Sequence, residues 1–182
     1  MGADIYLFDN GQKDIRDDQI TGFVSTEGYY RDAYNGSSIA RKLGFSWWQD
    51  VGDLMNKCGK YVDDDSEKGY HYEAHIERPE GVFGNLFGAP LVEFRDLVQK
   101  GIDENLYPAL EALWAEHKAD ICKAIRTPTS WFNDEPEGEQ RPDLPESECR
   151  AEYFKGYVDD AYRLLAMIQK AIDENGSLYC SI

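Results

Sequence analysis

The sequence predicts an α+β fold, in which a small β-sheet packs against several helices and a long helix lies near the C-terminus. Two patterns predict strands: residues 3–8 are mainly apolar, and residues 69–77 alternate strictly between apolar and polar side chains. Helices are predicted over residues 90–125 and 148–174, where apolar side chains recur at helical spacing. A sheet covered by helices buries both kinds of apolar face.

Length and composition predict a single globular domain over residues 1–182. A chain of 182 residues, 42% of them hydrophobic, is large enough to bury a core and too apolar to be globally disordered. Residues 127–148 hold four of the chain's seven prolines together with seven acidic residues. This composition predicts a long acidic loop within the domain.

The N-terminal part combines one clear strand with a region that has no clean period. Residues 3–8 are expected to form a buried first strand. Residues 12–35 mix charged and aromatic side chains and are interpreted as a loop with short elements. A short helix is expected to begin at a cap on Ser37 or Ser38 and to end at Gly44.

A second helix is predicted to begin at Ser46, because Ser46 and Gln49 have the spacing of a capping box. Gly59 is expected to end it. Its apolar side chains share one face: Trp47, Val51, Leu54, Met55 and Cys58. Trp48 follows Trp47 by about 100 degrees around a helix. Either neighbouring segments cover both indoles, or one indole leaves the apolar face and anchors an interface.

Glycine and proline residues mark the predicted boundaries of the loop, helices and strand in the rest of the chain. The glycine-rich residues 81–88 are interpreted as a packed loop, and Gly101 and Pro108 are expected to split residues 90–125 into two helices. The last helix should end before Asn175-Gly176, and residues 178–182 are expected to add a short edge strand. Its predicted apolar face consists of Phe154, Val158, Ala161, Leu165, Ile168 and Ile172.

The polar face of the predicted strand 69–77 carries metal-binding types of side chain: His71, Glu73, His75 and Glu77. Such a face can hold a divalent metal, although burial of the opposite face alone explains the alternation. We expect no metal there. The acids before the strand, Asp63, Asp64, Asp65 and Glu67, are interpreted as a solvated turn. An EF-hand would need glycine and glutamate where Lys68 and Ala74 stand.

No catalytic motif is present, because the chain lacks GxSxG, a phosphate-binding GxxxxGK[ST] loop and a strand-linked GxGxxG. His117 is an isolated histidine within a predicted helix and is given no role. We therefore expect a protein that is not an enzyme, holds no cofactor and acts by binding a partner.

The charge is strongly negative, with 35 acidic against 19 basic side chains and a formal net charge of -16. Such a charge disfavours nucleic acid and anionic membranes as partners and favours a basic protein surface, although many acidic proteins carry their charge without a partner. The start of the chain lacks the pattern of a signal peptide, which predicts a cytoplasmic protein. Cys58, Cys122, Cys149 and Cys180 are scattered and are expected to be reduced.

Three segments resemble a group of small proteins of phages and prophages: the start MGADIYL, the run GYYRDAYN at 28–35, and LGFSWWQDV at 43–51. The resemblance covers about the first third of the chain and implies no enzymatic activity. In size, acidity and phage-like character the chain is also similar to type II anti-CRISPR proteins, which inhibit Cas9. That similarity rests on no motif and transfers no inhibitory residue.

Cas9 holds nucleic acid in positively charged channels and reads its short recognition duplex with arginines, so a surface of Asp and Glu can compete for those guanidinium groups. The expected partner is thus Cas9 with its guide RNA in the host cytosol. The alternatives are a small phage metal-dependent enzyme and a phage structural or assembly adaptor. The candidate partner-binding residues are eight acids chosen by charge and Trp48 as the possible interface anchor: Asp63, Asp64, Asp65, Glu67, Asp134, Glu135, Glu137, Glu139 and Trp48.

Overall fold

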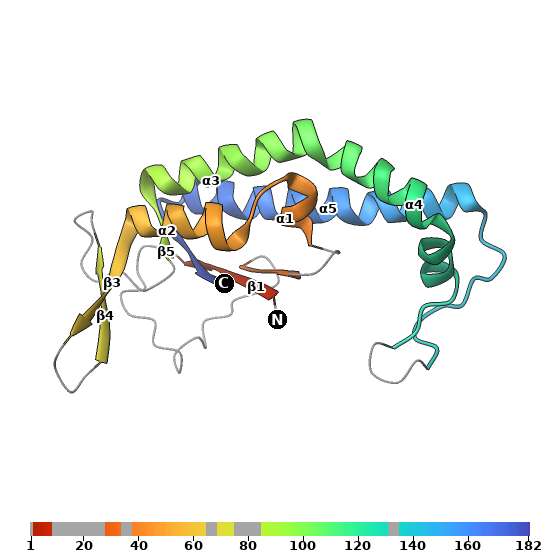
Figure 1. Ribbon diagram of the computed structural model, residues 1–182, viewed down its shortest axis with the longest axis horizontal. Helices are drawn as coiled ribbons and strands as arrows, with labels where there is room; N and C mark the ends of the chain where they lie inside the picture. Colours follow the sequence, from red (N-terminus) through yellow and green to blue (C-terminus); the bar gives the residue numbers. More distant parts are fainter. Residues whose placement is uncertain (1, 9–27, 34–37, 65–68, 75–84, 131–134) are drawn as a thin grey trace.

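The computed structural model describes residues 2–8, 28–33, 38–64, 69–74, 85–130 and 135–182. It confirms the α+β class. A four-stranded antiparallel sheet lies below a layer of helices (Figure 1), and its strand order is β2-β1-β6-β5. The strands are β1 (Gly2–Phe8), β2 (Tyr29–Ala33), β5 (Asn85–Leu86) and β6 (Ser177–Ser181).

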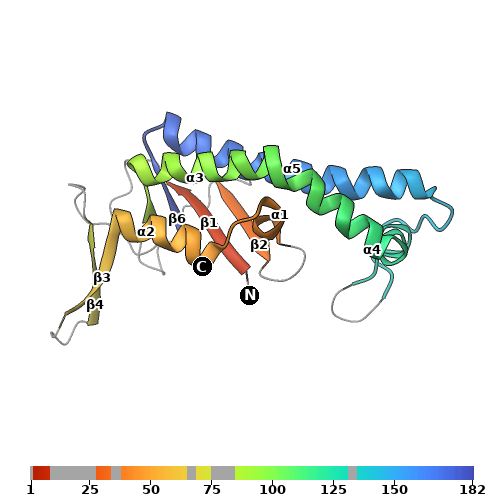
Figure 2. The same cartoon turned by 45° about the horizontal axis from the view of Figure 1, so that its top comes forward.

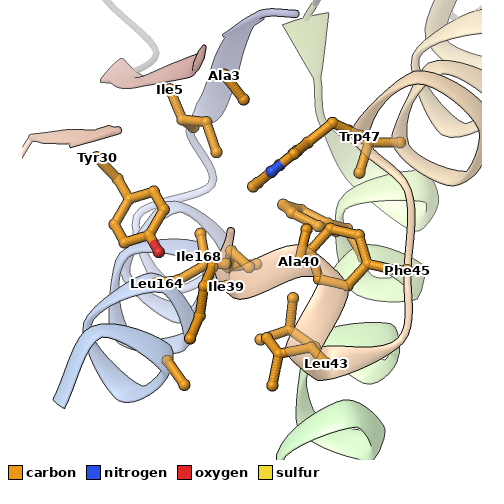
Figure 3. Close-up of a cluster of buried hydrophobic side chains, with 14 of the residues drawn as sticks. Ala3, Ile5, Tyr30, Ile39, Ala40, Leu43, Phe45, Trp47, Leu164 and Ile168 are labelled. Carbon is orange, nitrogen blue, oxygen red and sulfur yellow. The ribbon is translucent and has the colours of Figure 1, made fainter. Parts of the chain in front are cut away.

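Strand β1 lies inside the sheet, as its apolar sequence predicts. Ala3 and Ile5 are fully buried on the helix-covered face (Figure 3). Tyr6 points the other way and is paired in register with Tyr29 of β2 and Tyr179 of β6, so three tyrosines form one row across the sheet. The alternation of small apolar and aromatic residues thus separates the two faces.

Residues 29–33, within the region interpreted as a loop with short elements, form the short strand β2. This strand buries Tyr30 together with the charged Asp32 and so has no apolar alternation. One prediction about strands is wrong. The C-terminal strand is not at an edge. It lies beside β1 (Figure 2) and pairs with β1 on one side and β5 on the other. Its residues Leu178 and Cys180 are buried.

The helical layer begins with three short elements and continues with longer helices. Its members are α1 (Ile39–Leu43), the π-helical turn η2 (Trp47–Val51), α2 (Gly52–Cys58), α3 (Gly88–Gly101), the π-helical turn η3 (Ile102–Leu106), α4 (Tyr107–Arg126) and α5 (Glu146–Asp173). Both short helices predicted around Ser46 are present. Gly44 ends α1 with a left-handed φ of 80°, the conformation that favours glycine.

The predicted break at Gly101 is a packing contact within continuous helical structure. A Cβ atom on Gly101 would lie 2.5 Å from the carbonyl oxygen of Leu43, so only glycine allows α1 to approach this closely. The chain passes through η3 into α4, with Pro108 in the first turn of α4, where proline is tolerated. The division into two helices is confirmed, and the separator is a π-helical turn.

Helix α5 runs beside α3 and α4 and also covers β1 and β6 (Figure 1). Phe154, Ala161 and Ile168 of the predicted face are buried, but four further residues of α5 outside that face are buried as well: Cys149, Leu164, Met167 and Ala171. The remaining predicted members, Val158, Leu165 and Ile172, are only half-buried. The buried stripe is wider than one helical row because helices and sheet contact α5 from different sides.

A β-hairpin of β3 (Gly59–Asp64) and β4 (Gly69–Ala74) projects from the end of α2 (Figures 1 and 2). The strand predicted at 69–77 is confirmed as far as Ala74, and residues 75–77 lie outside the described residues. The solvated turn predicted over 63–67 is wrong for Asp63 and Asp64. Both pair in register with β4, because the chain must extend this far to complete the hairpin.

The acidic loop ends earlier than predicted, since α5 begins at Glu146. Its described part is tied by backbone hydrogen bonds, including Glu137 N to Pro128 O at 2.9 Å and Arg141 N to Arg126 O at 2.7 Å. Leu86 and Phe87 are buried as expected for the segment 81–88, of which residues 81–84 lie outside the described part.

All four cysteines are buried: Cys58, Cys122, Cys149 and Cys180. Their reduced state stays a prediction. Within the described ranges, every helix is either too short or too polar to span a bilayer.

Candidate functional site

The buried carboxylate of Asp32 joins β2 to the two short helices that follow it. Asp32 is 5% exposed and accepts the backbone N–H groups of Ile39 at 2.8 Å and Ala40 at 3.0 Å. It also accepts the hydroxyl of Ser38 and the indole N–H of Trp47, each at 2.7 Å. Asp32, rather than the predicted serine, therefore caps α1, and Ser38 binds the capping carboxylate.

Trp47 is held in the core by this hydrogen bond and by aromatic neighbours (Figure 3). It is 3% exposed, and its ring meets those of Phe45 at 5.1 Å and Phe94 at 5.8 Å edge-to-face. The polar end of the indole thus has a partner and its apolar body is packed.

Trp48 lies on the same π-helical turn but is 65% exposed. Coverage of both indoles by neighbouring segments is therefore wrong. The turn is capped at Ser46, whose hydroxyl accepts Gln49 N at 3.2 Å and whose N–H donates to Asp50 Oδ2 at 2.7 Å. The capping-box pattern predicts that the side chain of Gln49 accepts the Ser46 N–H. In the structure the Asp50 carboxylate accepts it instead. Because the core fixes Trp47 and the cap fixes the turn, the backbone directs Trp48 outward.

A hollow of about 260 Å³ lies beside Trp48. Its wall includes the apolar rings of Phe45 and both tryptophans together with Ser38, Ser46 and Arg41. An exposed indole next to a small hollow of mixed polarity can engage an apolar or cationic side chain of another protein. We name Trp48 and this hollow the Trp48 site.

The two candidate acidic clusters lie at opposite ends of the elongated molecule (Figure 1). Asp63 and Asp64 are in β3 of the projecting hairpin, while their side chains, and all of Asp65 and Glu67, lie outside what the structure describes. The other cluster belongs to the loop between α4 and α5. Its described members are exposed: Glu135, Glu137 and Glu139. Asp134 lies outside the described residues.

The candidate metal face falls mainly where side chains are not described. His71 and Glu73 are two residues apart in β4 and share a face, opposite Val62 and Lys60 of β3. His75 and Glu77 lie outside the described residues. Among the side chains that are described, no three His, Cys, Asp or Glu residues gather as metal ligands. The absence of a metal at this face stays a prediction.

A buried lysine beside Asp32 was not predicted. Lys42 is 2% exposed, its ammonium lies 4.1 Å from the ring centroid of Tyr157, and it donates to Ser38 O at 3.4 Å. Burial lowers the pKa of Lys42 to about 8, against the opposing effect of Asp32. The only signal in the sequence is that Lys42 lies between the apolar Ile39, Ala40 and Leu43.

The hydrogen bond between Asp32 and Trp47 joins the segments 28–35 and 43–51. The resemblance of these segments to phage proteins stays a hypothesis. No protein-family model matches the chain, and no curated protein and no solved structure is significantly similar to it.

Proposed function

We propose that this protein is a phage-encoded inhibitor that binds a basic protein in the host cytosol, and that this partner is Cas9 with its guide RNA. In this proposal it acts without catalysis, metal or cofactor and impedes DNA binding or cleavage by Cas9. The exposure of Trp48 on a turn anchored in the core is the observation that carries the binding role.

Trp48 has the properties of an interface anchor. Tryptophan is enriched among residues that dominate binding energy, since a rigid indole buries a large area at a small cost in side-chain entropy. The described residues include two other large exposed aromatics, Tyr107 at 54% and Tyr162 at 51%, and Trp48 is more exposed than either. The adjacent hollow adds a concave surface for a partner side chain.

The charge supports a basic partner. A net charge of -16 attracts positively charged surfaces and accelerates their association. Cas9-type nucleases contain such surfaces where they hold nucleic acid. Carboxylates bind guanidinium groups in the geometry that phosphates use, so exposed Glu and Asp side chains can occupy arginines that otherwise contact DNA.

Because the two acidic clusters lie at opposite ends, substitutions in each cluster can show which end contacts the partner. Neutralising Asp63, Asp64, Asp65 and Glu67, or Asp134, Glu135, Glu137 and Glu139, removes four negative charges from one end or the other. Both sets change the long-range attraction equally and should slow association. The set that also speeds dissociation identifies the end in contact with the partner.

The direct test is DNA cleavage by purified Cas9 and guide RNA with excess protein, together with binding measured by surface plasmon resonance. Cleavage should fall, and Trp48→Ala should weaken binding by on the order of 2 kcal/mol. Tyr162→Ala, which removes a comparably exposed aromatic from α5, is the matched control and should leave binding unchanged.

Undiminished cleavage by several Cas9 orthologues, without a complex on gel filtration, would reject the proposal and favour a phage assembly adaptor. Stoichiometric zinc or manganese in dialysed protein would instead favour an enzyme using the face of His71, Glu73, His75 and Glu77. Equal loss of affinity in Trp48→Ala and Tyr162→Ala would remove the Trp48 site from the interface.

A further inference from the structure

A cleft of about 500 Å³ lies away from the Trp48 site. It is bounded by β2 on one side, by α5 on another and by the end of α4 at Ile125. Asp32 and Ala33 come from the strand, and Tyr153, Gly156, Tyr157 and Asp160 come from the helix. The cleft therefore lies on the outer side of the region where Asp32 caps α1.

Acidic side chains outnumber basic ones among the residues lining the cleft. Asp32, Glu152 and Asp160 contribute carboxylates, and Arg31 contributes a guanidinium. Two of these groups are engaged at the margins: Glu152 binds Arg141 through two hydrogen bonds of 2.6 and 2.7 Å, and Arg31 lies 3.6 Å from Asp4. Asp32 receives four hydrogen bonds, and the Lys42 ammonium lies 4.1 Å from the ring centroid of Tyr157. The carboxylate left to act within the cleft is that of Asp160.

Asp160 is the carboxylate in the cleft whose charge is least compensated. Arg163 approaches it only to 4.0 Å, beyond hydrogen-bond distance, whereas Asp32 receives four hydrogen bonds. Partial burial raises the pKa of Asp160, the Arg163 guanidinium opposes this rise, and the negative charges of Asp32 and Asp159 add to it. A cation placed in the cleft would relieve this unfavourable environment.

Aromatic rings supply the wall beside Asp160. Tyr153 and Tyr157 meet edge-to-face with centroids 5.1 Å apart. Elsewhere the protein places its own guanidinium groups over rings, Arg150 over Phe154 at 4.3 Å and Arg163 over Tyr30 at 5.1 Å. A planar guanidinium can stack on a tyrosine while it binds a carboxylate through two parallel hydrogen bonds in its plane, and an ammonium has no plane for such stacking.

Gly156 leaves the backbone of α5 open to the cleft. It lies in the interior of the 28-residue helix α5, where glycine is less favourable than alanine. A Cβ atom built on Gly156 meets nothing within 4 Å, so the packing of the chain does not require glycine there. Glycine does keep the helix backbone accessible from the cleft, as close approach of a ligand requires.

We infer that this cleft binds an arginine side chain of a partner protein, with the guanidinium against Tyr157 and Asp160 and over the backbone of Gly156. The inference rests on the proposed function in taking the arginine from a basic protein partner. It adds a second contact point to the Trp48 site and specifies guanidinium as the group recognised.

The test uses N-acetyl-arginine N-methylamide as the probe, titrated into the full-length ¹⁵N-labelled protein and followed by NMR. Saturable shifts of the Gly156 and Asp160 amides in the millimolar range are expected, as suits a single side chain. The citrulline analogue, which is isosteric and neutral, should produce no saturable shift, and the lysine analogue should bind more weakly.

Two substitutions with matched controls locate the site. Asp160→Asn should weaken binding of the probe by roughly tenfold, as loss of a charged hydrogen bond does. Asp159→Asn should not, because Asp159 pairs with Lys155 and does not line the cleft. Gly156→Leu should abolish binding yet raise Tm by about 2–4 °C, because leucine favours the helix. Ala151→Leu on another face of α5 should leave binding intact. Opposite effects on stability and binding exclude misfolding as the cause.

Equal shifts with arginine and citrulline, equal affinity for lysine, or binding that survives Gly156→Leu would each overturn the inference. The probe experiment contains no Cas9, so the two proposals fail separately. Arginine binding without Cas9 binding would reject the function and keep the cleft. Cas9 inhibition that is unchanged by Gly156→Leu would remove the cleft from that interface.

Discussion

Asp32 and Glu152 are both carboxylates that tie separate segments together, but their surroundings differ. Asp32 is 5% exposed and receives four hydrogen bonds from α1, Ser38 and Trp47. The Glu152 side chain is 42% exposed and binds Arg141 alone. Buried polar groups are costly to leave unpaired, whereas water replaces the partners of exposed ones. The comparison teaches that similar polar contacts contribute unequally to this fold.

Removal of the buried carboxylate is expected to have the largest effect. Asp32→Ala should lower the free energy of unfolding by about 3–5 kcal/mol, because it leaves buried donors without an acceptor and α1 without a cap. The control Asp50→Ala removes an exposed carboxylate that caps η2 and should cost about 1 kcal/mol. Urea denaturation followed by circular dichroism measures both. Equal losses would contradict the special role of Asp32.

The two neighbouring tryptophans give a matched pair of substitutions. Trp47→Phe removes the indole N–H that binds Asp32 and should cost about 1.5–3 kcal/mol, the range for a hydrogen bond to a charged group. Trp48→Phe changes an exposed ring and should alter stability by less than about 0.5 kcal/mol. The same urea titrations measure both losses of stability. A larger loss for Trp48→Phe than for Trp47→Phe would contradict the burial of Trp47 and the exposure of Trp48.

Lys42 should make the stability of the Asp32 region depend on pH. Its pKa is about 8 in the folded protein against 10.5 for an unperturbed lysine, so the unfolded chain holds the proton more tightly. The unfavourable contribution of Lys42 is therefore complete below about pH 8 and declines as pH rises towards 10.5. Relative to Lys42→Met, the parent protein should gain about 2 kcal/mol between pH 7 and pH 9.5.

Comparison with Lys42→Met is needed because other buried groups act in the opposite direction. Burial raises the pKa of Tyr157 and of the Cys180 thiol, which makes the parent protein less stable as alkaline pH deprotonates the unfolded chain. Those groups are present in both proteins, so their contributions cancel in the difference. A difference that does not vary with pH would show that Lys42 keeps an ordinary pKa.

The exposed pair should give the smallest effect. Hydrogen bonding to Arg141 lowers the pKa of Glu152, so its contribution is present above the ordinary glutamate pKa and is lost as pH falls through the lowered value. Glu152→Gln should shift the urea midpoint only slightly at neutral pH and not at all in acid. A midpoint shift as large as that of Asp32→Ala would erase the contrast between buried and exposed carboxylates.

Much of the fold follows from local pattern. The strand at 69–74, the long helix α5 and the end of α1 at Gly44 each depend on side chains near in sequence, and each is present in the structure. Strand β2 and the inner position of β6 were not predictable in this way. Asp32 is buried because of donors six to fifteen residues away, and β6 is internal because β5 pairs with its second edge.

Of the candidate site, the sequence by itself determined the net charge and the presence of two adjacent tryptophans on a capped turn. Only the tertiary structure decided that Trp47 is buried and Trp48 exposed, that Lys42 lies in the core, and that the acidic clusters occupy opposite ends. Charge is a sum over residues and needs no coordinates. Exposure and spacing depend on which distant segments pack against a residue, and here the packing of β2, α3 and α5 decides them.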